Sequence, residues 1–369
     1  MGTGVSHMQQ VLAKRLLFSI LGWDNVKIEK YSELIGNFAE LKYDEYQQYK
    51  PGNRFVEHLC AWLNQFEKGR ERDIAFNFLF NNLVFISSSE MHHLIETAYH
   101  ELILPLFTLQ ADIFCKDDNV LRTNIQSIIN LIQTKSLFFA LSDGARIDVM
   151  RRIALLEHDQ VFTAYELADT KYNEIIREMK NRVITMELSQ KIVSKLPEEV
   201  NHVFLIDDFS GSGISYLRIE DGQWKGKIAR VLERLEKENI IGNNSKTKIH
   251  IILYLATQKA FDYINNEIEN FKEVNKLEIE INVKYVQLIN KVILTREEES
   301  LFLKHYKSVE SEVADSHYKK GNMDYPHHGF DCCSLALVIH HNTPNNSFPV
   351  IWAGEHALFP RIKRHKDVN

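Results

Sequence analysis

The sequence is poor in cysteine: its 369 residues include only four, and no two of them form a CxxC pair. Apolar or mixed stretches surround Cys60, Cys115, Cys332 and Cys333, which is typical of reduced thiols in a cytosolic protein and not of a disulfide framework. No stretch approaches the roughly 18 apolar residues that cross a bilayer, and the N-terminus lacks a signal-peptide pattern. We therefore expect a cytoplasmic protein without a membrane partner.

An excess of charge of one sign is also missing. The formal net charge is −6, from 44 basic and 50 acidic residues that are interleaved along the chain. A broad footprint for nucleic acid or for an anionic membrane is therefore not indicated, although a local basic patch is compatible with this charge. Hydrophobic residues make up 44% and charged residues 25%, which is the usual mixture of a globular protein that buries a large core.

The chain contains no internal repeat and no low-complexity linker, so its division depends on hydrophobic periodicity. Residues 1–8, MGTGVSHM, look like a vector-derived extension and are left out of the fold prediction. Over residues 9–135 apolar residues recur at helical spacing, which predicts a helical region. Over residues 136–369 β-rich runs alternate with helical segments, which predicts an α/β domain with a largely parallel sheet flanked by helices. The runs expected to be strands are SLFFAL (136–141), HVFLIDD (202–208), KIHIILYLAT (248–257), LEIEINVKYVQ (277–287), SLALVIHH (334–341) and FPVIWA (348–353).

The stretch VFLIDDFSGSGIS, residues 203–215, carries the clearest chemical signal. Four apolar residues lead into Asp207 and Asp208, where a parallel strand would end and ligands would bind. Gly211 and Gly213 lack a Cβ, so the backbone N–H groups of the loop can turn toward one phosphate, and serine hydroxyls add further donors. A loop without lysine is not a P-loop. An ordinary turn would explain the glycines and serines, but not an aspartate pair after a buried run.

This stretch resembles the signature of type I phosphoribosyltransferases, which bind 5-phosphoribosyl-1-pyrophosphate (PRPP). The resemblance implies that Asp207 and Asp208 are the catalytic acids and hold the ribose 2- and 3-hydroxyls. It implies that the 5-phosphate is cradled by Ser210, Gly211, Ser212, Gly213, Ile214 and Ser215. The sequence departs from the family pattern after the loop, because YLRIEDGQWKGK (216–227) separates it from the next helical segment.

Two flanking motifs add candidate residues. In LSDGARIDVMRR (141–152), Ser142 or Asp143 is a good N-cap for a helix, and Arg146 near its N-terminus suits a pyrophosphate group. A capped helix with solvated arginines is the competing interpretation. In HHNTPNNSFPVIW (340–352), a turn between two strands is expected, and a loop that contacts the substrate base would place His341, Asn342 and Thr343 there.

Histidines are frequent near the C-terminus, at His327, His328, His340, His341, His356 and His365. Adjacent histidines on a strand point to opposite faces and do not converge on one metal ion. We therefore expect no dedicated zinc site.

A second resemblance covers most of residues 70–361. Together LSDGARIDVMRR, DGQWKGK (221–227), HNTPNNSFPVIW (341–352), LFPR (358–361) and ERDIAFNFLFNNLVFISSSEMHHL (71–94) are similar to the phosphoribosyltransferase-like proteins of bacterial conflict systems, called PRTase-CE. That resemblance implies an effector of anti-phage defence. Its implied partners are proteins, or a retron-type nucleoprotein with a reverse transcriptase, from the same operon.

The sequence thus predicts a phosphoribosyltransferase-like effector that binds PRPP or a related ribose 5-phosphate or nucleotide. An enzyme of this kind would displace pyrophosphate at the anomeric carbon, with Mg²⁺ bound through the phosphates offsetting the charge. Two alternatives stay open: a module that senses PRPP or a nucleotide without turnover, and a scaffold that controls a partner protein. A homo-oligomer is also compatible with the sequence.

Overall fold

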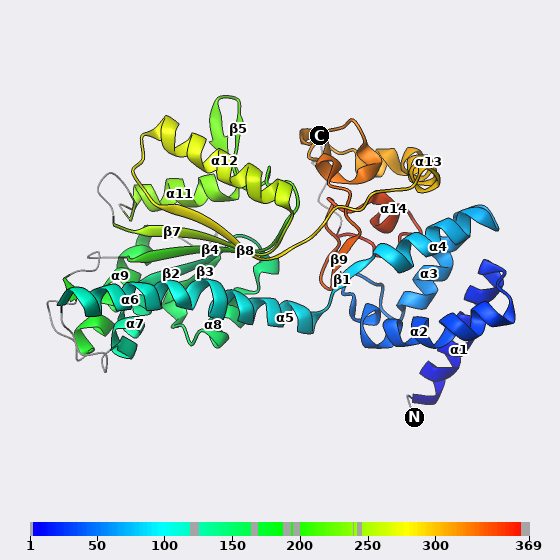
Figure 1. The fold of residues 1–369 in the computed structure, drawn as a ribbon, viewed down its shortest axis with the longest axis horizontal. Helices are drawn as coiled ribbons and strands as arrows, with labels where there is room; N and C mark the ends of the chain where they lie inside the picture. Colours follow the sequence, from blue (N-terminus) through cyan, green and yellow to red (C-terminus); the bar gives the residue numbers. More distant parts are fainter. Residues whose placement is uncertain are drawn as a thin grey trace. The chain divides into compact units, whose positions relative to one another are not determined.

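The computed structural model describes residues 3–118, 125–163, 169–186, 193–194, 200–238, 240–241 and 246–362. The chain forms two compact units (Figure 1). The first unit combines Met1–Glu90 with Asn290–Asn369, and the second unit is the continuous segment Met91–Ile289. This division differs from the boundary expected at residue 136, because the C-terminal segment shares a unit with the N-terminal helices.

The second unit is built around a five-stranded sheet in which all neighbouring strands are parallel. Its central strands are apolar along most of their length because both faces of the sheet are covered, as in other parallel sheets. In spatial order the strands are β3 (Val161–Thr163), β2 (Ser136–Ala140), β4 (His202–Ser210), β7 (Lys248–Ala256) and β8 (Ile281–Leu288).

The order of these strands creates a crevice at one edge of the sheet. β2 and β4 are neighbours, with Ala140 opposite Ile206, although β3 lies between them in the sequence. The chain therefore leaves the carboxyl ends of β2 and β4 toward opposite sides of the sheet. In open parallel sheets ligands bind at this topological switch point.

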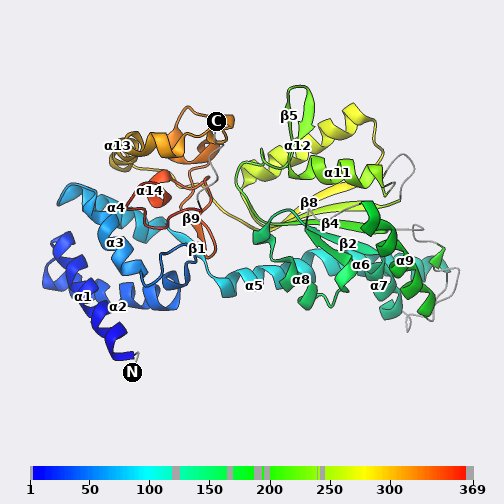
Figure 2. The same cartoon turned by 180° about the vertical axis from the view of Figure 1, so that it is seen from behind.

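Helices cover both faces of the sheet. The helices described between residues 88 and 275 include α5 (Ser88–Thr97), a π-helical turn (Ala98–Ile103), α6 (Leu104–Asp118), α7 (Ile125–Thr134), α8 (Ile147–Ile153), α9 (Asp169–Thr185), α11 (Lys227–Lys237) and α12 (Gln258–Asn275). α11 and α12 lie over one face, and α6 and α7 lie over the other (Figures 1 and 2). In α11 the residues Ile228, Val231, Leu232 and Leu235 recur at helical spacing and are all buried, which makes one side of this helix part of the core.

A pair of histidines interrupts the apolar sheet. His202 on β4 and His250 on β7 are buried, and their Nδ1 and Nε2 atoms lie 2.9 Å apart. His202 Nε2 also lies 2.8 Å from Gln110 Oε1 on α6. Burial lowers the pKa of each histidine to about 3. Both rings are therefore neutral in the folded protein near pH 7.

The first unit is mainly helical. It contains α1 (Thr3–Leu21), α2 (Asn25–Leu41), α3 (Phe55–Asn64), α4 (Arg70–Asn82), β1 (Val84–Ile86), α13 (Arg296–Val313), β9 (Leu337–Ile339) and α14 (Pro349–Trp352). Strands β1 and β9 form a separate two-stranded parallel sheet, with Phe85 opposite Val338. The N-terminal and C-terminal segments are thus joined by backbone pairing as well as by packing.

Two of the expected strands behave differently in this unit. The run SLALVIHH contributes only the short β9, which pairs with β1 and not with the five-stranded sheet. The run FPVIWA was expected to be a strand and is wrong: residues Pro349–Trp352 form α14. Pro349 at the first turn favours a helix start, and a short apolar run fits a buried helix as well as a buried strand. The other four runs contain strands of the parallel sheet.

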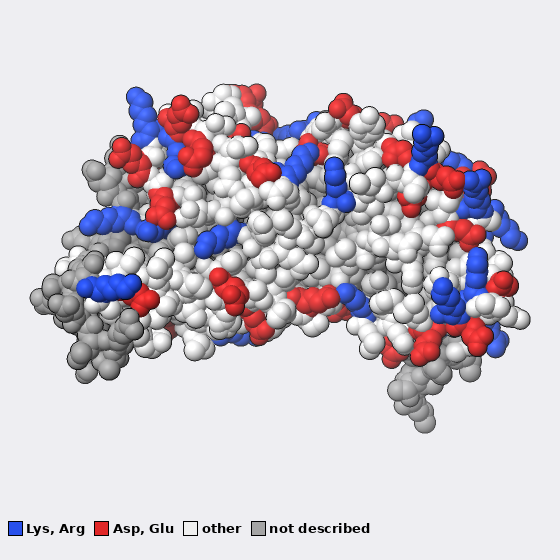
Figure 3. All heavy atoms as spheres, in the orientation of Figure 1, with Lys and Arg blue, Asp and Glu red and all other residues white. Residues whose placement is uncertain are grey.

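The predicted α/β fold class is confirmed, with a parallel sheet flanked by helices and helices at the N-terminus. Within the described ranges, the helices are each too short or too polar to cross a membrane. Acidic and basic side chains are interspersed on the face of the molecule that Figure 3 shows. This mixture agrees with the absence of a one-signed charge excess in the sequence.

Candidate functional site at the carboxyl ends of β2 and β4

The two aspartates lie at the carboxyl end of β4 but in different surroundings. Asp207 is fully buried and Asp208 is half-buried. Alternation along the strand gives Asp207 the same face as Leu205, which belongs to the core cluster under α11 and α12. Asp208 is the next residue along the strand, and the hydroxyl of Ser142 reaches the carboxylates of both acids.

Asp207 is held by three side chains of the protein. Its carboxylate accepts hydrogen bonds from the hydroxyls of Ser142 and Tyr216 and from the ammonium of Lys227. The Tyr216 Oη and Lys227 Nζ atoms each lie 2.5 Å from Oδ2. Burial raises the pKa of Asp207, and the nearby ammonium of Lys227 opposes this effect. The carboxylate of Asp207 is thus engaged by protein donors in this structure, and its predicted role toward a ribose stays a prediction.

Asp208 is the more exposed of the two acids. It is half-buried at the sheet edge, and Ser142 Oγ lies 3.2 Å from its Oδ1. The resemblance to phosphoribosyltransferases implies that both acids hold ribose hydroxyls. This role stays a prediction for both residues, which differ in burial.

The loop that follows β4 presents a run of backbone donors. Two of its carbonyl oxygens accept hydrogen bonds from the protein: Gly211 O from Thr257 Oγ1 at 2.5 Å, and Gly213 O from Tyr216 N at 2.8 Å. In the described part of the chain, by contrast, no protein atom accepts a hydrogen bond from the N–H groups of residues 211–215. Residues 211–213 are buried, whereas Ile214 and Ser215 are half-buried. Because buried N–H groups need acceptors, five in succession suit an anion.

Gly213 has a conformation that explains why a glycine stands there. Its φ of +81° lies in the left-handed region. A Cβ at this position would lie 2.7 Å from the Tyr263 ring and 3.1 Å from Ala260 O, both on α12. A side chain at Gly213 would therefore push α12 away from the loop, and would not simply fill the phosphate seat.

The insertion after the loop is a β-hairpin whose two ends lie next to each other. Strands β5 (Arg218–Glu220) and β6 (Gln223–Lys225) pair in antiparallel fashion around a two-residue turn. The backbone N–H of Lys227 then donates to Ser215 O at 3.0 Å. The helix α11 therefore begins beside the end of the loop, and the hairpin lies between the two in the sequence.

This return places Lys227 beside Asp207, a contact that the sequence analysis missed. The lysine was not among the predicted site residues because it follows Asp207 by twenty positions and an inserted hairpin. A signal was present in the sequence: the DGQWKGK motif ends at Lys227, which is the first residue of α11. Burial, together with Asp207, keeps the pKa of Tyr216 well above its usual value, so Tyr216 is a lasting donor to the same carboxylate.

Ser142, Asp143 and Arg146 also lie at this edge of the sheet, after β2. The prediction that Ser142 or Asp143 caps the helix is wrong, because Arg146 precedes α8 and no side chain caps it. Ser142 precedes a 3-10 turn (Asp143–Ala145) without a capping side-chain bond, and its hydroxyl binds the aspartates instead. Arg146 has a left-handed φ of 45°, and its Nε lies 3.7 Å from Asp148 Oδ1. The structure thus brings the 142–146 segment to the β4 acids.

The residues His341, Asn342 and Thr343 belong to the first unit, apart from the other candidates. Thr343 is fully buried, and its Oγ1 lies 2.8 Å from Tyr46 Oη and 3.1 Å from Phe359 O. Asn342 Oδ1 accepts from the backbone of Ile362 at 3.1 Å. These bonds give Asn342 and Thr343 a role inside their own unit. Their predicted contact with a substrate stays a prediction.

The prediction that adjacent histidines do not converge is wrong for His327 and His328. They lie in a 3-10 turn (Pro326–His328), not on a strand, so adjacent side chains need not point to opposite faces. Both rings reach the carboxylate of Glu299. His365 lies outside the described residues.

Comparison with known proteins identifies the family. The family model PRTase-CE matches residues 59–361, a range that includes both aspartates, the loop, the hairpin and the C-terminal motifs. No curated protein and no solved structure matches the chain. The match covers most of the chain, and the parallel sheet with an acidic pair and a glycine-containing loop agrees with it. The chain therefore belongs to the PRTase-CE family, which indicates a phosphoribosyltransferase-like role.

Proposed function

We propose that the second unit binds PRPP or a closely related ribose 5-phosphate compound at the carboxyl ends of β2 and β4. The observation that carries this proposal is the run of five backbone N–H groups without protein acceptors in residues 211–215, next to the half-buried carboxylate of Asp208. The run suits a phosphate, and a carboxylate suits the vicinal hydroxyls of a ribose.

Each part of the site then has a separate task. Backbone donors of residues 211–215 hold the 5-phosphate, and Asp208 accepts hydrogen bonds from the ribose hydroxyls. Asp207 stays inside the protein and orients Ser142, Tyr216 and Lys227. Arg146 and the turn after β2 lie where a pyrophosphate group on the anomeric carbon would extend, because this turn follows the neighbouring strand.

Mg²⁺ fits this site as an ion that is bound mainly through the ligand. Asp207 is fully buried, so Asp208, the more exposed of the two acids, is the carboxylate that would contact a hard cation. When bound, Mg²⁺ would offset the charge of pyrophosphate as a leaving group. Ser142 and Asp208 would orient the ribose beside it.

Binding is tested by calorimetry with PRPP in the presence and absence of Mg²⁺. Asp208→Asn and Ser215→Asp should each weaken binding by at least about tenfold, because one removes a charged acceptor and the other adds a negative charge among the phosphate donors. Asp262→Asn, on the exposed surface of α12, removes the same charge elsewhere in the unit and should bind normally. Unchanged affinity in Asp208→Asn and Ser215→Asp would reject the site.

Whether the bound compound is turned over is a separate question. The enclosure of Asp207 by protein donors favours a sensing module as the second candidate function, because only one acid faces the ligand. Pyrophosphate release in the presence of candidate acceptors would identify an enzyme. Mg²⁺-dependent binding without pyrophosphate release would identify a sensor.

In the cell, the proposed role is that of a cytoplasmic effector in anti-phage defence, held inactive by partners from its operon. Membership of the PRTase-CE family supports this proposal. Expression of the chain alone should slow growth, co-expression of neighbouring genes should restore it, and Asp208→Asn should be harmless. A chain that is harmless at high level and rapidly joins PRPP to one free nucleobase would instead be a salvage enzyme.

A further inference from the structure

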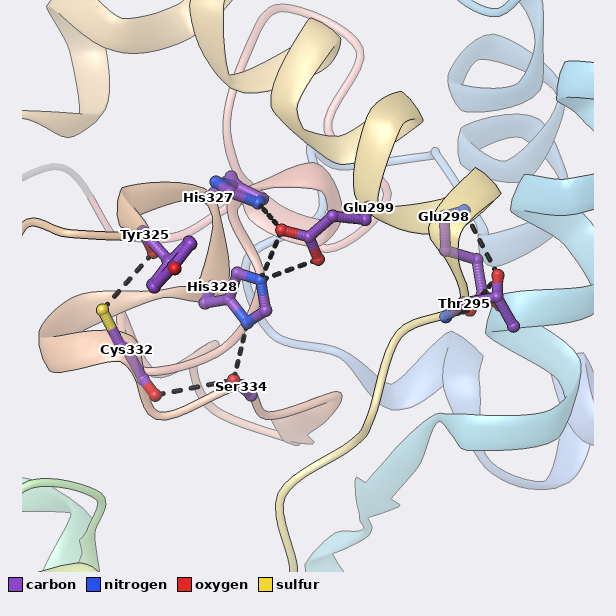
Figure 4. Close-up of polar contacts among 8 residues, drawn as sticks. All are labelled: Thr295, Glu298, Glu299, Tyr325, His327, His328, Cys332 and Ser334. Carbon is purple, nitrogen blue, oxygen red and sulfur yellow. Dashed lines mark hydrogen bonds and ion pairs between the residues drawn. The ribbon is translucent and has the colours of Figure 1, made fainter.

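Glu299, His327 and His328 form a cluster in the first unit that the proposed function does not use. Glu299 lies in the first turn of α13, and the two histidines lie in the 3-10 turn Pro326–His328 (Figure 4). One ligand atom from each residue lies within 4.8 Å of the others. All three residues belong to the first unit.

Both imidazoles present the same nitrogen to the carboxylate. Glu299 Oε1 lies 2.6 Å from His327 Nε2, and Oε2 lies 2.9 Å from His328 Nε2. The two rings are inclined by 72° with centroids 4.6 Å apart, so their Nε2 atoms converge without stacking. Ligands at about 2.0 Å from a tetrahedral zinc are about 3.3 Å from one another, so the carboxylate oxygens would have to move about 0.7 Å away from His327 Nε2 and about 0.4 Å away from His328 Nε2 to admit an ion.

The far side of one ring is fixed as it is in metal sites. His328 Nδ1 lies 2.8 Å from Ser334 Oγ, which can accept a hydrogen bond from an Nδ1–H group. In that tautomer the Nε2 lone pair is available to a metal. Figure 4 shows Ser334 on the side of His328 away from Glu299. The thiol of Cys332 is turned to the Tyr325 carbonyl at 3.5 Å and does not join the cluster.

The cluster is held rigidly and is open on one side. His328 N donates to Tyr325 O at 2.9 Å, and Ser334 N donates to His328 O at 2.7 Å, which ties both ends of the turn. The side chains of His327 and His328 are 4% and 18% exposed, while that of Glu299 is 37% exposed. An ion could therefore enter past the carboxylate, and two imidazoles with one carboxylate would leave a coordination position for water or another ligand.

We propose that Glu299, His327 and His328 bind one divalent transition-metal ion, with zinc as the preferred occupant. Two neutral imidazole nitrogens and one carboxylate are a ligand set that zinc and its neighbours accept, whereas calcium and magnesium prefer oxygen alone. The ion joins α13 to the 326–334 segment of the same unit. It does so independently of the phosphate loop in the second unit.

The test is titration of the chelator-treated full-length chain with Zn²⁺ by calorimetry. Cobalt absorption spectra, in which a tetrahedral site gives intense visible bands, provide the second readout. Wild-type protein should bind one ion, and Glu299→Gln or His328→Gln should bind at least about 100-fold more weakly. Ser334→Ala, which removes only the support of His328, should lose about 10- to 100-fold in affinity.

Glu298→Gln is the matched control, because Glu298 lies beside Glu299 in the same helical turn but points to Thr295 (Figure 4). It should bind zinc as the wild type does. Circular dichroism at several temperatures checks that each variant is folded. The proposal is overturned if folded wild-type protein takes up no ion at micromolar zinc, or if Glu299→Gln and Glu298→Gln bind equally well.

Discussion

Replacing Lys227 by methionine should destabilise the second unit more than replacing its partner does. The Lys227 side chain is 25% exposed, whereas that of Asp207 is 0% exposed. In Lys227→Met the carboxylate stays buried without its cation, and it must either remain charged in an apolar setting or take up a proton. In Asp207→Asn the lysine can turn toward solvent, because a quarter of it already faces water.

The size of the effect follows from this asymmetry. Removing one partner of a buried ion pair costs about 3–5 kcal/mol. Two hydroxyl donors, from Ser142 and Tyr216, remain on Asp207, so we expect Lys227→Met to cost about 3 kcal/mol, near the lower end. Asp207→Asn should cost about 1–2 kcal/mol. The double variant should lose less than the sum of the two, by about 1–2 kcal/mol, because the stranded charge is then absent.

Hydrogen exchange with mass spectrometry is the appropriate assay, because a chain with two units need not unfold in one step. Peptides from β4 and β7 report the second unit, and peptides from α13 report the first. Lys225→Met is the matched control: this lysine is 41% exposed and lies 3.6 Å from an exposed Asp221, so its loss should cost less than about 1 kcal/mol. If the β4 amides are equally protected from exchange in Lys227→Met and Lys225→Met, the buried ion pair does not stabilise the second unit.

Two further perturbations test other parts of the second unit. His202 and His250 have pKa values of about 3 in the folded protein, below the usual 6.5. The unfolded chain therefore binds more protons than the folded chain below pH 6.5. Stability that is present above pH 6.5 is lost as the pH falls toward 3. Between pH 6.5 and 5 the loss should be about 2 kcal/mol for each histidine, measured by exchange in β4 and β7; an equal loss in a variant with both histidines changed to glutamine would contradict it. Gly213→Ala should lower the melting temperature more than Gly222→Ala, because both glycines have positive φ but only Gly213 has the Tyr263 ring and Ala260 O against the added Cβ; equal losses would mean that backbone strain alone matters.

Local patterns in the sequence were sufficient for the parts of the site that are local in the chain. A run of apolar residues, two aspartates and a glycine-containing loop predicted a buried strand followed by a loop, and β4 with residues 211–215 has this form. Ligand binding by the loop stays a prediction. Four of the six expected strands lie in the parallel sheet, because a strand buried on both faces leaves a continuous apolar run. The family was also recognisable from motifs, and the match over residues 59–361 confirms it.

Tertiary structure decided which residues meet. Only packing under α11 determines that Asp207 is the acid enclosed by Lys227 and Tyr216. The β1–β9 pairing joins residues 84 and 337, which are far apart in the sequence. The short apolar run FPVIWA fits a buried helix as well as a buried strand, and in the fold its residues Pro349–Trp352 form a helix. The convergence of His327 and His328 on Glu299 requires a 3-10 turn and a helix that begins 31 positions earlier. Such contacts depend on how distant segments bury their apolar faces together, and no short window of sequence contains that information.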